Sequence, residues 1–325
     1  MPATSSPLPV VLAAVGLCAL GRATVAASFD CAKAATPVET AVCADPILSA
    51  LDEWLAERLA TAMARSLDPE GLRQDQRIWL TVRDTDGTAT PRSLAAMYRR
   101  RLDQLDKEIA GLDKIETARD TTEAEARSAC PALLNDVPDT VGSCEVTGFG
   151  EIGTADGHAF LYGLYTFHTA KGDFPWRTSV VVYAREGDKL RALFAPREDG
   201  TFYDVPTIVT VADRIVLHLP GYESGTGNFN RERVFLWRNG AWAVADATSW
   251  YSDLVLRLPG DYEALKGIYP DYGRMTAATL LWRKKTDGNC CPTGGRADMT
   301  LGWRDDRLVI KNLQVKLGRK YAEHL

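Results

Sequence analysis

The chain has 325 residues, 46% of them hydrophobic and 25% charged, and a formal net charge of -5 at pH 7. This composition is typical of a globular protein, and the length is sufficient for two domains. An acidic chain of this kind lacks the basic surface that nucleic acid requires, so nucleic acid is excluded as an expected partner.

Residues 1–27 predict a signal peptide. A continuous apolar stretch at residues 9–20 is followed by small residues, and Val25 and Ala27 fit the −3 and −1 positions of a secretory cleavage site. The apolar stretch is shorter than the roughly 20 residues that a transmembrane helix needs. Although no Lys or Arg precedes it, as in the usual signal peptide, we expect cleavage after Ala27. The mature chain is then periplasmic or secreted and has no membrane span.

Beyond the signal peptide the cysteines form an even set: Cys31, Cys43, Cys130, Cys144, Cys290 and Cys291. An even set in an exported chain predicts disulfides. Local spacing favours pairing the first with the second and the third with the fourth. The adjacent last two are then either a vicinal disulfide or two thiols. No CxxC, CxxH or HExxH spacing occurs in the sequence, so we expect no metal site.

Residues 28–125 have the pattern of a helical domain. Three segments begin with a capping residue and a proline, which suit the free amides of a helix start; they are Thr36-Pro37, Asp45-Pro46 and Asp68-Pro69. Thr36 with Glu39 also forms a capping box. Two stripes of apolar residues have helical spacing: Leu51, Leu55, Leu59 and Met63, and then Leu94, Tyr98, Leu105 and Ile109. We predict a helical hairpin or bundle, entered by a short helix that the Cys31–Cys43 disulfide staples to a long one.

From Cys130 onward the hydrophobic period changes to two, which is typical of strands. Three segments have the pattern strand, polar turn, strand: SVVVYAREGDKLRALF, RVFLWRNGAWAVAD and MTLGWRDDRLVIKN. Asn239-Gly240 is the strongest hairpin signal. Tyr183, Trp237 and Trp303 precede the turns, and we interpret them as cross-strand packing residues; the alternative is that one of them lines a binding surface. Residues 126–325 are therefore predicted to be an antiparallel all-β domain, a sandwich or barrel-like sheet, and the whole chain to have an α+β fold.

The segment FDCAKAATPVETAVCADPILSALD, followed by QRIWLTVRD and LAAMYRRRLDQL, resembles the N-terminal domain of the LprI family of exported lysozyme inhibitors. The resemblance covers residues 29–106. It implies a helical module. Because Cys, Trp and Tyr in so small a module are best explained as its staple and core, we interpret the matching residues as scaffold and not contact residues. Apart from the first two cysteines, these residues include Phe29, Glu39, Asp52, Trp79, Arg83, Tyr98 and Arg101.

The chain departs from the family pattern at one disulfide. The family usually has a second cysteine pair at positions where this chain has Asp86 and Ser93. A lost cross-link of this size costs about 2–4 kcal/mol, so the helix-hairpin tip must depend on packing or on the second domain. Further along, residues 265–303 resemble the CCP-[ST]-G segment of uncharacterised exported bacterial proteins, which implies a compartment but no reaction.

No complete catalytic or cofactor motif occurs in the sequence, so we expect neither an enzyme nor a cofactor. Ser224, in GYESGTGNF, lies one place late for a G-x-S-x-G nucleophile motif and precedes no helical pattern. We interpret residues 221–229 as a glycine-rich surface loop.

The resemblance implies an envelope protein that binds lysozyme or another cell-wall hydrolase, with a loop entering the cleft of the enzyme. One candidate region is the helix-hairpin tip at residues 84–91. The other is the glycine-rich loop, whose candidate contact residues are Glu223, Ser224, Gly225, Gly227 and Phe229. The alternative function is that of a structural or accessory envelope protein without inhibitory activity.

Overall fold

The structure is a computed structural model that describes residues 27–85, 90–134, 141–170, 175–196, 198 and 200–318. Residues 1–26 of the predicted signal peptide, and Asp86 at the predicted hairpin tip, lie outside the described residues. Contacts within the chain divide it into two compact units. The first unit is Met1–Glu57 with Val82–Leu102, and the second unit is Arg58–Thr81 with Asp103–Leu325.

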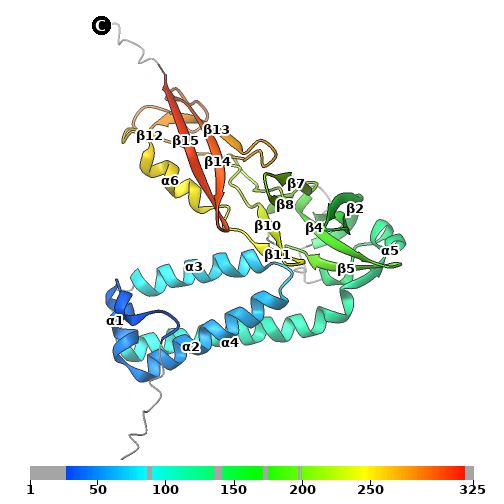
Figure 1. Cartoon of the computed structure of the whole chain (residues 1–325), viewed down its shortest axis with the longest axis horizontal. Helices are drawn as coiled ribbons and strands as arrows, with labels where there is room; N and C mark the ends of the chain where they lie inside the picture. The colour runs from blue at the N-terminus through cyan, green and yellow to red at the C-terminus, as the bar shows by residue number, and fades with distance from the viewer. Residues whose placement is uncertain are drawn as a thin grey trace, which may run out of the picture. The chain divides into compact units, whose positions relative to one another are not determined.

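In the described part of the chain, the N-terminal third forms four α-helices, drawn in blue to cyan in Figure 1: α1 (Pro37–Ala44), α2 (Pro46–Arg65), α3 (Pro69–Thr85) and α4 (Pro91–Ile115). Each begins with proline. Proline lacks a backbone N–H, but at the first position of a helix this group would have no intrahelical acceptor, so no hydrogen bond is lost. Thr36 and Glu39 form the predicted capping box, with the Glu39 N–H donating to Thr36 Oγ1 at 3.1 Å. Asp45 caps α2 by accepting from the Ile47 N–H at 2.8 Å. The three predicted helix starts are confirmed.

The apolar stripes of the first unit lie on buried faces of α2 and α4. Leu51 and Leu55 of α2 are buried, as are Leu94 and Tyr98 of α4. The two residues of each pair are four positions apart, so they share one face of their helix. The helical part of the α+β prediction is therefore confirmed.

The disulfide between Cys31 and Cys43 forms as predicted, with a Cα–Cα distance of 5.8 Å. It joins the 3-10 turn Cys31–Lys33 to the short helix α1, and not to the long helix α2 as we expected. The reason is that α1 begins at Pro37 and includes Cys43, whereas α2 begins only at Pro46, after the second cysteine.

The strands of the second unit form antiparallel sheets. The first sheet has the order β1-β5-β4-β3-β2 and contains β1 (Asp120–Thr122), β2 (Val141–Ala155), β3 (His158–Thr169), β4 (Pro175–Glu186) and β5 (Lys189–Phe194). The second has the order β11-β10-β8-β7 and contains β7 (Thr207–Val211), β8 (Arg214–Leu219), β10 (Arg233–Arg238) and β11 (Ala241–Val244).

A third sheet has the order β12-β13-β14-β15 and contains β12 (Tyr262–Glu263), β13 (Thr276–Arg283), β14 (Gly295–Arg304) and β15 (Arg307–Leu317). The strands β6 (Thr201–Tyr203) and β9 (Gly221–Glu223) pair with each other, and α5 (Glu123–Ser128) and α6 (Ser249–Arg257) are short helices among the strands. The antiparallel β part of the prediction is confirmed.

Successive side chains of β4 enter two different hydrophobic cores. Val181 and Tyr183 are buried on one face of the first sheet. Val180 and Val182 are buried on the other face, together with Phe235 of the second sheet. Side chains alternate across a strand. Val180 and Val182 therefore lie where the first sheet packs face to face with the second sheet, and Val181 and Tyr183 lie in the core on the opposite face of the first sheet.

The second sheet is also buried on both faces. Phe235 points to the first sheet, and its neighbours Val234 and Leu236 lie in a core with Trp250 of α6 and Leu308 of β15. This burial explains why RVFLW is a continuous apolar run and not an alternating one.

The three predicted hairpins form, as β4–β5, β10–β11 and β14–β15. Asn239 and Gly240 have φ values of 50° and 78°, the left-handed conformations that a two-residue hairpin turn requires. Trp237 pairs across the strands with Trp242, and their ring centroids are 5.0 Å apart. The interpretation of Trp237 as a cross-strand packing residue is confirmed.

Candidate functional site

Three residues that carry the family resemblance meet in a buried network in the first unit. The Tyr98 hydroxyl donates to Asp52 Oδ1 at 2.7 Å and accepts from Arg83 Nη1 at 2.8 Å. Arg83 Nε donates to Asp84 Oδ1 at 2.7 Å. Burial raises the pKa of Tyr98, and the charge of Asp52 adds to this while Arg83 opposes it, so the hydroxyl stays protonated. The network cross-links α2, α3 and α4.

The other residues of the family pattern lie apart from this network or at its edge. Glu39 belongs to the capping box of α1. Phe29, Trp79 and Arg101 are half-buried. For a half-buried Trp79, truncation to Ala costs less than the roughly 3–5 kcal/mol expected at a fully buried position.

The remaining cysteines pair within the second unit. Cys130 and Cys144 form a disulfide with a Cα–Cα distance of 6.3 Å. Of the two alternatives for the last pair, the structure has the disulfide, between the adjacent Cys290 and Cys291.

A carboxylate fixes the turn that carries this vicinal disulfide. Asp287 Oδ2 accepts from the backbone N–H groups of Arg283 at 2.8 Å and Thr293 at 2.7 Å, while its Oδ1 accepts from Thr293 Oγ1 at 2.6 Å. Burial acts to raise the pKa of Asp287, but the hydrogen bonds from Thr293 and Arg283 outweigh it and lower the pKa to about 2. The ionised carboxylate therefore closes the turn.

We predict that acid opens this turn in a narrow pH window. Because folding lowers the pKa of Asp287 from 3.8 to about 2, its stabilising effect is present above pH 3.8 and is lost as the pH falls toward 2. NMR titration of the Asp287 carboxyl and of the Thr293 amide should show one shared low-pH transition. Replacement with Asn should abolish the transition at Thr293, whereas titration of Asp287 at its ordinary value would contradict the prediction.

The glycine-rich loop is held at its base by two segments distant in sequence. The Gly267 N–H donates to the Gly227 carbonyl at 2.9 Å. Asn230 clamps Ile268, donating to its carbonyl and accepting from its N–H, both at 2.7 Å. From the turn with the vicinal disulfide, Asn289 Nδ2 donates to Thr226 Oγ1 at 3.2 Å. The loop and the segment that resembles exported proteins therefore form one surface.

Two glycines make this geometry possible. Gly225 has φ +125°, a conformation that side chains disfavour. At Gly267 an added Cβ would collide with the carbonyl oxygen of Asn228, so only glycine allows the two backbones to approach.

The loop surface displays aromatic side chains. Phe229 is 50% exposed, Tyr222 is 38% exposed and Tyr269 is 49% exposed. The Tyr269 hydroxyl donates to the Asn228 carbonyl, which fixes this ring against the loop. Half-exposed aromatic side chains on a fixed base are typical of protein recognition surfaces. Among the predicted contact residues, Glu223 pairs with Arg231 at 3.1 Å.

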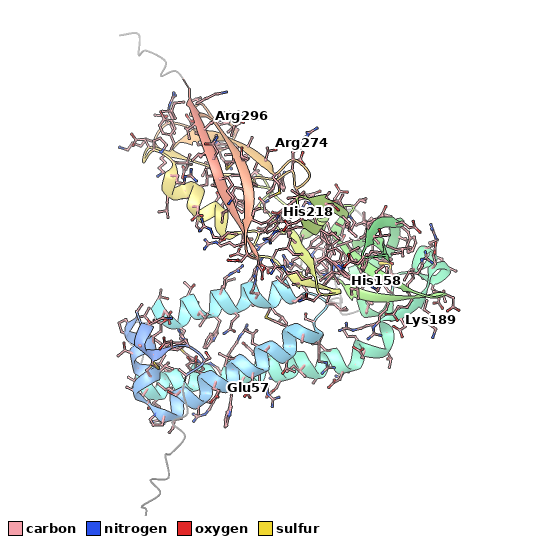
Figure 2. The ribbon with its side chains drawn as sticks, viewed as in Figure 1. Glu57, His158, Lys189, His218, Arg274 and Arg296 are labelled. Carbon is pink, nitrogen blue, oxygen red and sulfur yellow. A yellow bond between two sulfur atoms is a disulfide. The ribbon has the colours of Figure 1, made fainter. Side chains whose placement is uncertain are left out.

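A pocket of ≈ 220 Å³ opens beside Phe229 and is lined in part by Glu232. Glu232 is buried, and its Oε2 lies 2.8 Å from His218 Nε2; Figure 2 labels His218. The His218 ring is 4.5 Å from that of Tyr272. Burial and the charge of Glu232 raise the pKa of Tyr272 well above its ordinary value. Of these three side chains, Glu232 lines the pocket, and its carboxylate can accept a hydrogen bond from a ligand or partner. No motif in the sequence groups these residues.

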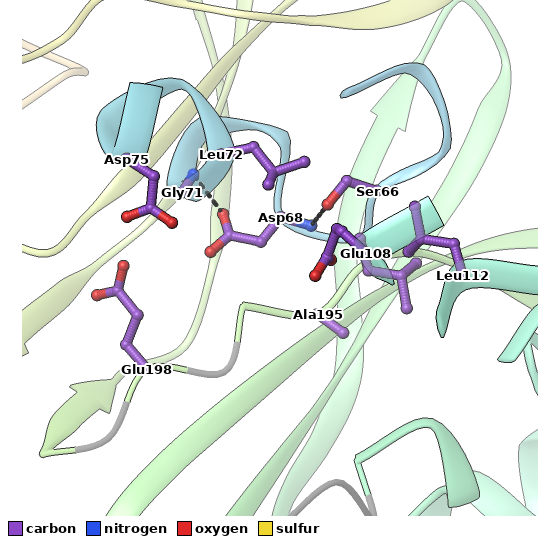
Figure 3. Close-up of a pocket in the computed structure, with 10 residues that line it drawn as sticks. Ser66, Asp68, Gly71, Leu72, Asp75, Glu108, Leu112, Ala195 and Glu198 are labelled. Atoms are coloured by element: carbon purple, nitrogen blue, oxygen red, sulfur yellow. Dashed lines mark hydrogen bonds between the residues drawn. The ribbon is translucent and has the colours of Figure 1, made fainter. Parts of the chain in front are cut away.

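A second pocket, of ≈ 230 Å³, is lined by carboxylates: Asp68, Asp75, Glu108 and Glu198. In Figure 3 the carboxylates of Asp75 and Glu198 point toward one another. Asp68 also accepts from the Gly71 N–H at 3.0 Å and so caps α3. Asp68 and Glu198 both bind the buried guanidinium of Arg233, so this pocket borders a structural ion-pair cluster.

A larger cavity, of ≈ 580 Å³, has an aromatic wall. Phe160 and Trp242 are 5.3 Å apart between ring centroids, and His158 and Trp237 are 5.7 Å apart. Trp237 Nε1 donates to Asp156 Oδ2 at 2.6 Å. Such walls suit a flat or apolar ligand. The sequence favoured packing for Trp237 over lining a binding surface, because cross-strand pairing and lining a cavity produce the same alternating pattern.

Comparison of the sequence with protein-family models and with curated proteins gives no match. Within the described ranges, no three His, Cys, Asp or Glu side chains are grouped so that they hold a metal ion. None of the described helices combines the length and apolarity needed to cross a membrane.

Proposed function

We propose that the protein is an exported envelope protein that binds lysozyme or another cell-wall hydrolase without catalysis, as the LprI family does. The observation that carries the proposal is the glycine-rich loop, which presents Phe229 with Tyr222 and Tyr269 on a base fixed by hydrogen bonds. A loop that enters an enzyme cleft needs a few exposed anchors and little freedom to lose on binding.

Two further features support this function. The burial of Asp52, Arg83 and Tyr98 in one hydrogen-bonded network supports the proposal that these residues, which carry the resemblance, act as scaffold. The disulfides suit folding in an oxidising compartment such as the periplasm or the extracellular space.

The function is tested by adding the purified mature chain to lysozymes, and to wall hydrolases of the same organism, during hydrolysis of cell walls. We expect inhibition at stoichiometric concentration. Because the chain is acidic, we also expect added salt to weaken binding if the enzyme is basic. Absence of both binding and inhibition with every hydrolase would support the alternative of an accessory envelope protein.

We predict that Phe229→Ala weakens inhibition at least about tenfold, because truncation of an interface anchor costs about 2 kcal/mol or more and about 1.4 kcal/mol corresponds to tenfold. Leu256→Ala, on α6, is the matched control, since Leu256 is 83% exposed and lies outside the loop. The inhibition constant and the melting temperature should be measured for both variants. Equal inhibition by the two variants would exclude the loop as the contact region.

A further inference from the structure

A carboxylate in the buried network also binds the start of the described chain. Asp52 Oδ2 accepts from the Ser28 backbone nitrogen at 2.8 Å and from Ser28 Oγ at 2.6 Å. Asp52 is only 5% exposed, and its other oxygen accepts from Tyr98. One oxygen of a buried carboxylate is thus devoted to Ser28, although Ser28 itself is exposed.

Position 28 is the residue that export would place at the chain end. Val25 and Ala27 predict cleavage of the bond between Ala27 and Ser28. Water adds across that peptide bond, so that Ala27 leaves as a carboxylate and the Ser28 nitrogen becomes a primary amine, protonated to an ammonium at neutral pH. The atom already within hydrogen-bond distance of Asp52 then carries a positive charge.

We propose that Asp52 is the binding site for the α-ammonium of Ser28, so that signal cleavage completes the buried network. Arg83 Nη1 lies 3.7 Å from Asp52 Oδ1, and the same guanidinium pairs with Asp84 at 2.7 Å. Two carboxylates therefore share this guanidinium. An ammonium at Ser28 adds a positive charge beside Asp52 and replaces an amide donor with a charge-assisted one, which forms a stronger hydrogen bond.

Binding at this site should shift the pKa of the Ser28 α-amine. A carboxylate partner raises the pKa of the Ser28 amine above its ordinary range of about 7.7–8.0. The stabilisation is therefore fully present below the pKa of the unfolded chain and is lost as the pH rises through the higher pKa of the folded chain.

The test compares three chains: the mature chain beginning at Ser28, the same chain extended by Gly at its N-terminus, and the mature chain with Asp52→Asn. NMR titration of the isotopically methylated α-amine should give a pKa about one unit higher in the mature chain than in the other two. Between pH 7 and pH 10 the melting temperature should fall more for the mature chain than for the extended chain. The extension leaves every side chain in place, so it remains informative if Asp52→Asn does not fold.

An amine of ordinary pKa in the folded mature chain would overturn the proposal. So would an exported chain whose N-terminus, determined by mass spectrometry, is not Ser28. Asp103→Asn on α4, which removes an exposed carboxylate paired with Lys107, is the control and should leave the pKa of the amine unchanged. The inference rests on export alone, so it stands or falls independently of hydrolase inhibition.

Discussion

Replacing Arg233 with Met should lower the free energy of unfolding by about 3–5 kcal/mol, because it leaves two carboxylates without their buried cation. The Arg233 side chain is 0% exposed, and it donates to Asp68 at 2.7 Å and 3.0 Å and to Glu198 at 2.5 Å. Burial acts to lower the pKa of Arg233, but the charges of Tyr203, Asp68 and Glu198 outweigh it, so the guanidinium stays charged.

Urea unfolding of Arg233→Met should be compared with that of Arg296→Met. Arg296 pairs with Asp298 at 2.6 Å, but both side chains are substantially exposed, so this control should cost no more than about 1 kcal/mol. Arg233→Lys should recover little, because an ammonium cannot make the two parallel bonds to Asp68. Equal losses for Arg233→Met and Arg296→Met would show that the buried pair contributes no more than a surface pair.

The features that sequence predicted well are those with a local cause. The helix starts depend on a capping side chain and a proline within four residues, as at Thr36 and Glu39. The turn at Asn239-Gly240 depends on two backbone conformations that these residues adopt at low cost. Neither needs information from a distant part of the chain.

The arrangement of the sheets was not predictable in the same way. The order β11-β10-β8-β7 places strands together that the hairpin patterns do not connect. Because β4 and β10 are buried on both faces, their sequences are continuous apolar runs. Such a run does not indicate which core each side chain enters. The ion pair of Asp68 with Arg233 joins residues 165 positions apart, and no spacing rule relates them.

The candidate loop surface also has features that the sequence predicts and features that it does not. Its glycines and Phe229 were visible in the sequence as an unusual local composition. Its supports were not, because Asn230 and Gly267 act only through contacts with segments that the fold brings near. Glu232 and His218 were not predicted, because an isolated His on β8 and an isolated Glu directly before β10 form no sequence motif.

In the first unit, Arg83→Met should lower the free energy of unfolding by about 3 kcal/mol or more. The Arg83 side chain is 4% exposed and is the cation that links Asp84, Tyr98 and Asp52. Its removal leaves Asp52 buried with only its hydrogen bonds and leaves the Tyr98 hydroxyl without one donor, and an uncompensated buried charge costs several kcal/mol.

Arg100→Met is the matched control, because Arg100 lies on the exposed face of α4 and its loss should change stability by no more than about 0.5 kcal/mol. Arg83→Lys should be nearly as destabilising as Arg83→Met, since a single ammonium cannot serve both Asp84 and Tyr98 with the geometry of the guanidinium. Urea unfolding monitored by amide exchange of Leu51 and Leu94 would report this unit directly. If Arg83→Met and Arg100→Met had equal stability, the buried network would not be what holds α2, α3 and α4 together, and the scaffold role proposed for the residues that carry the resemblance would have to rest on their apolar packing.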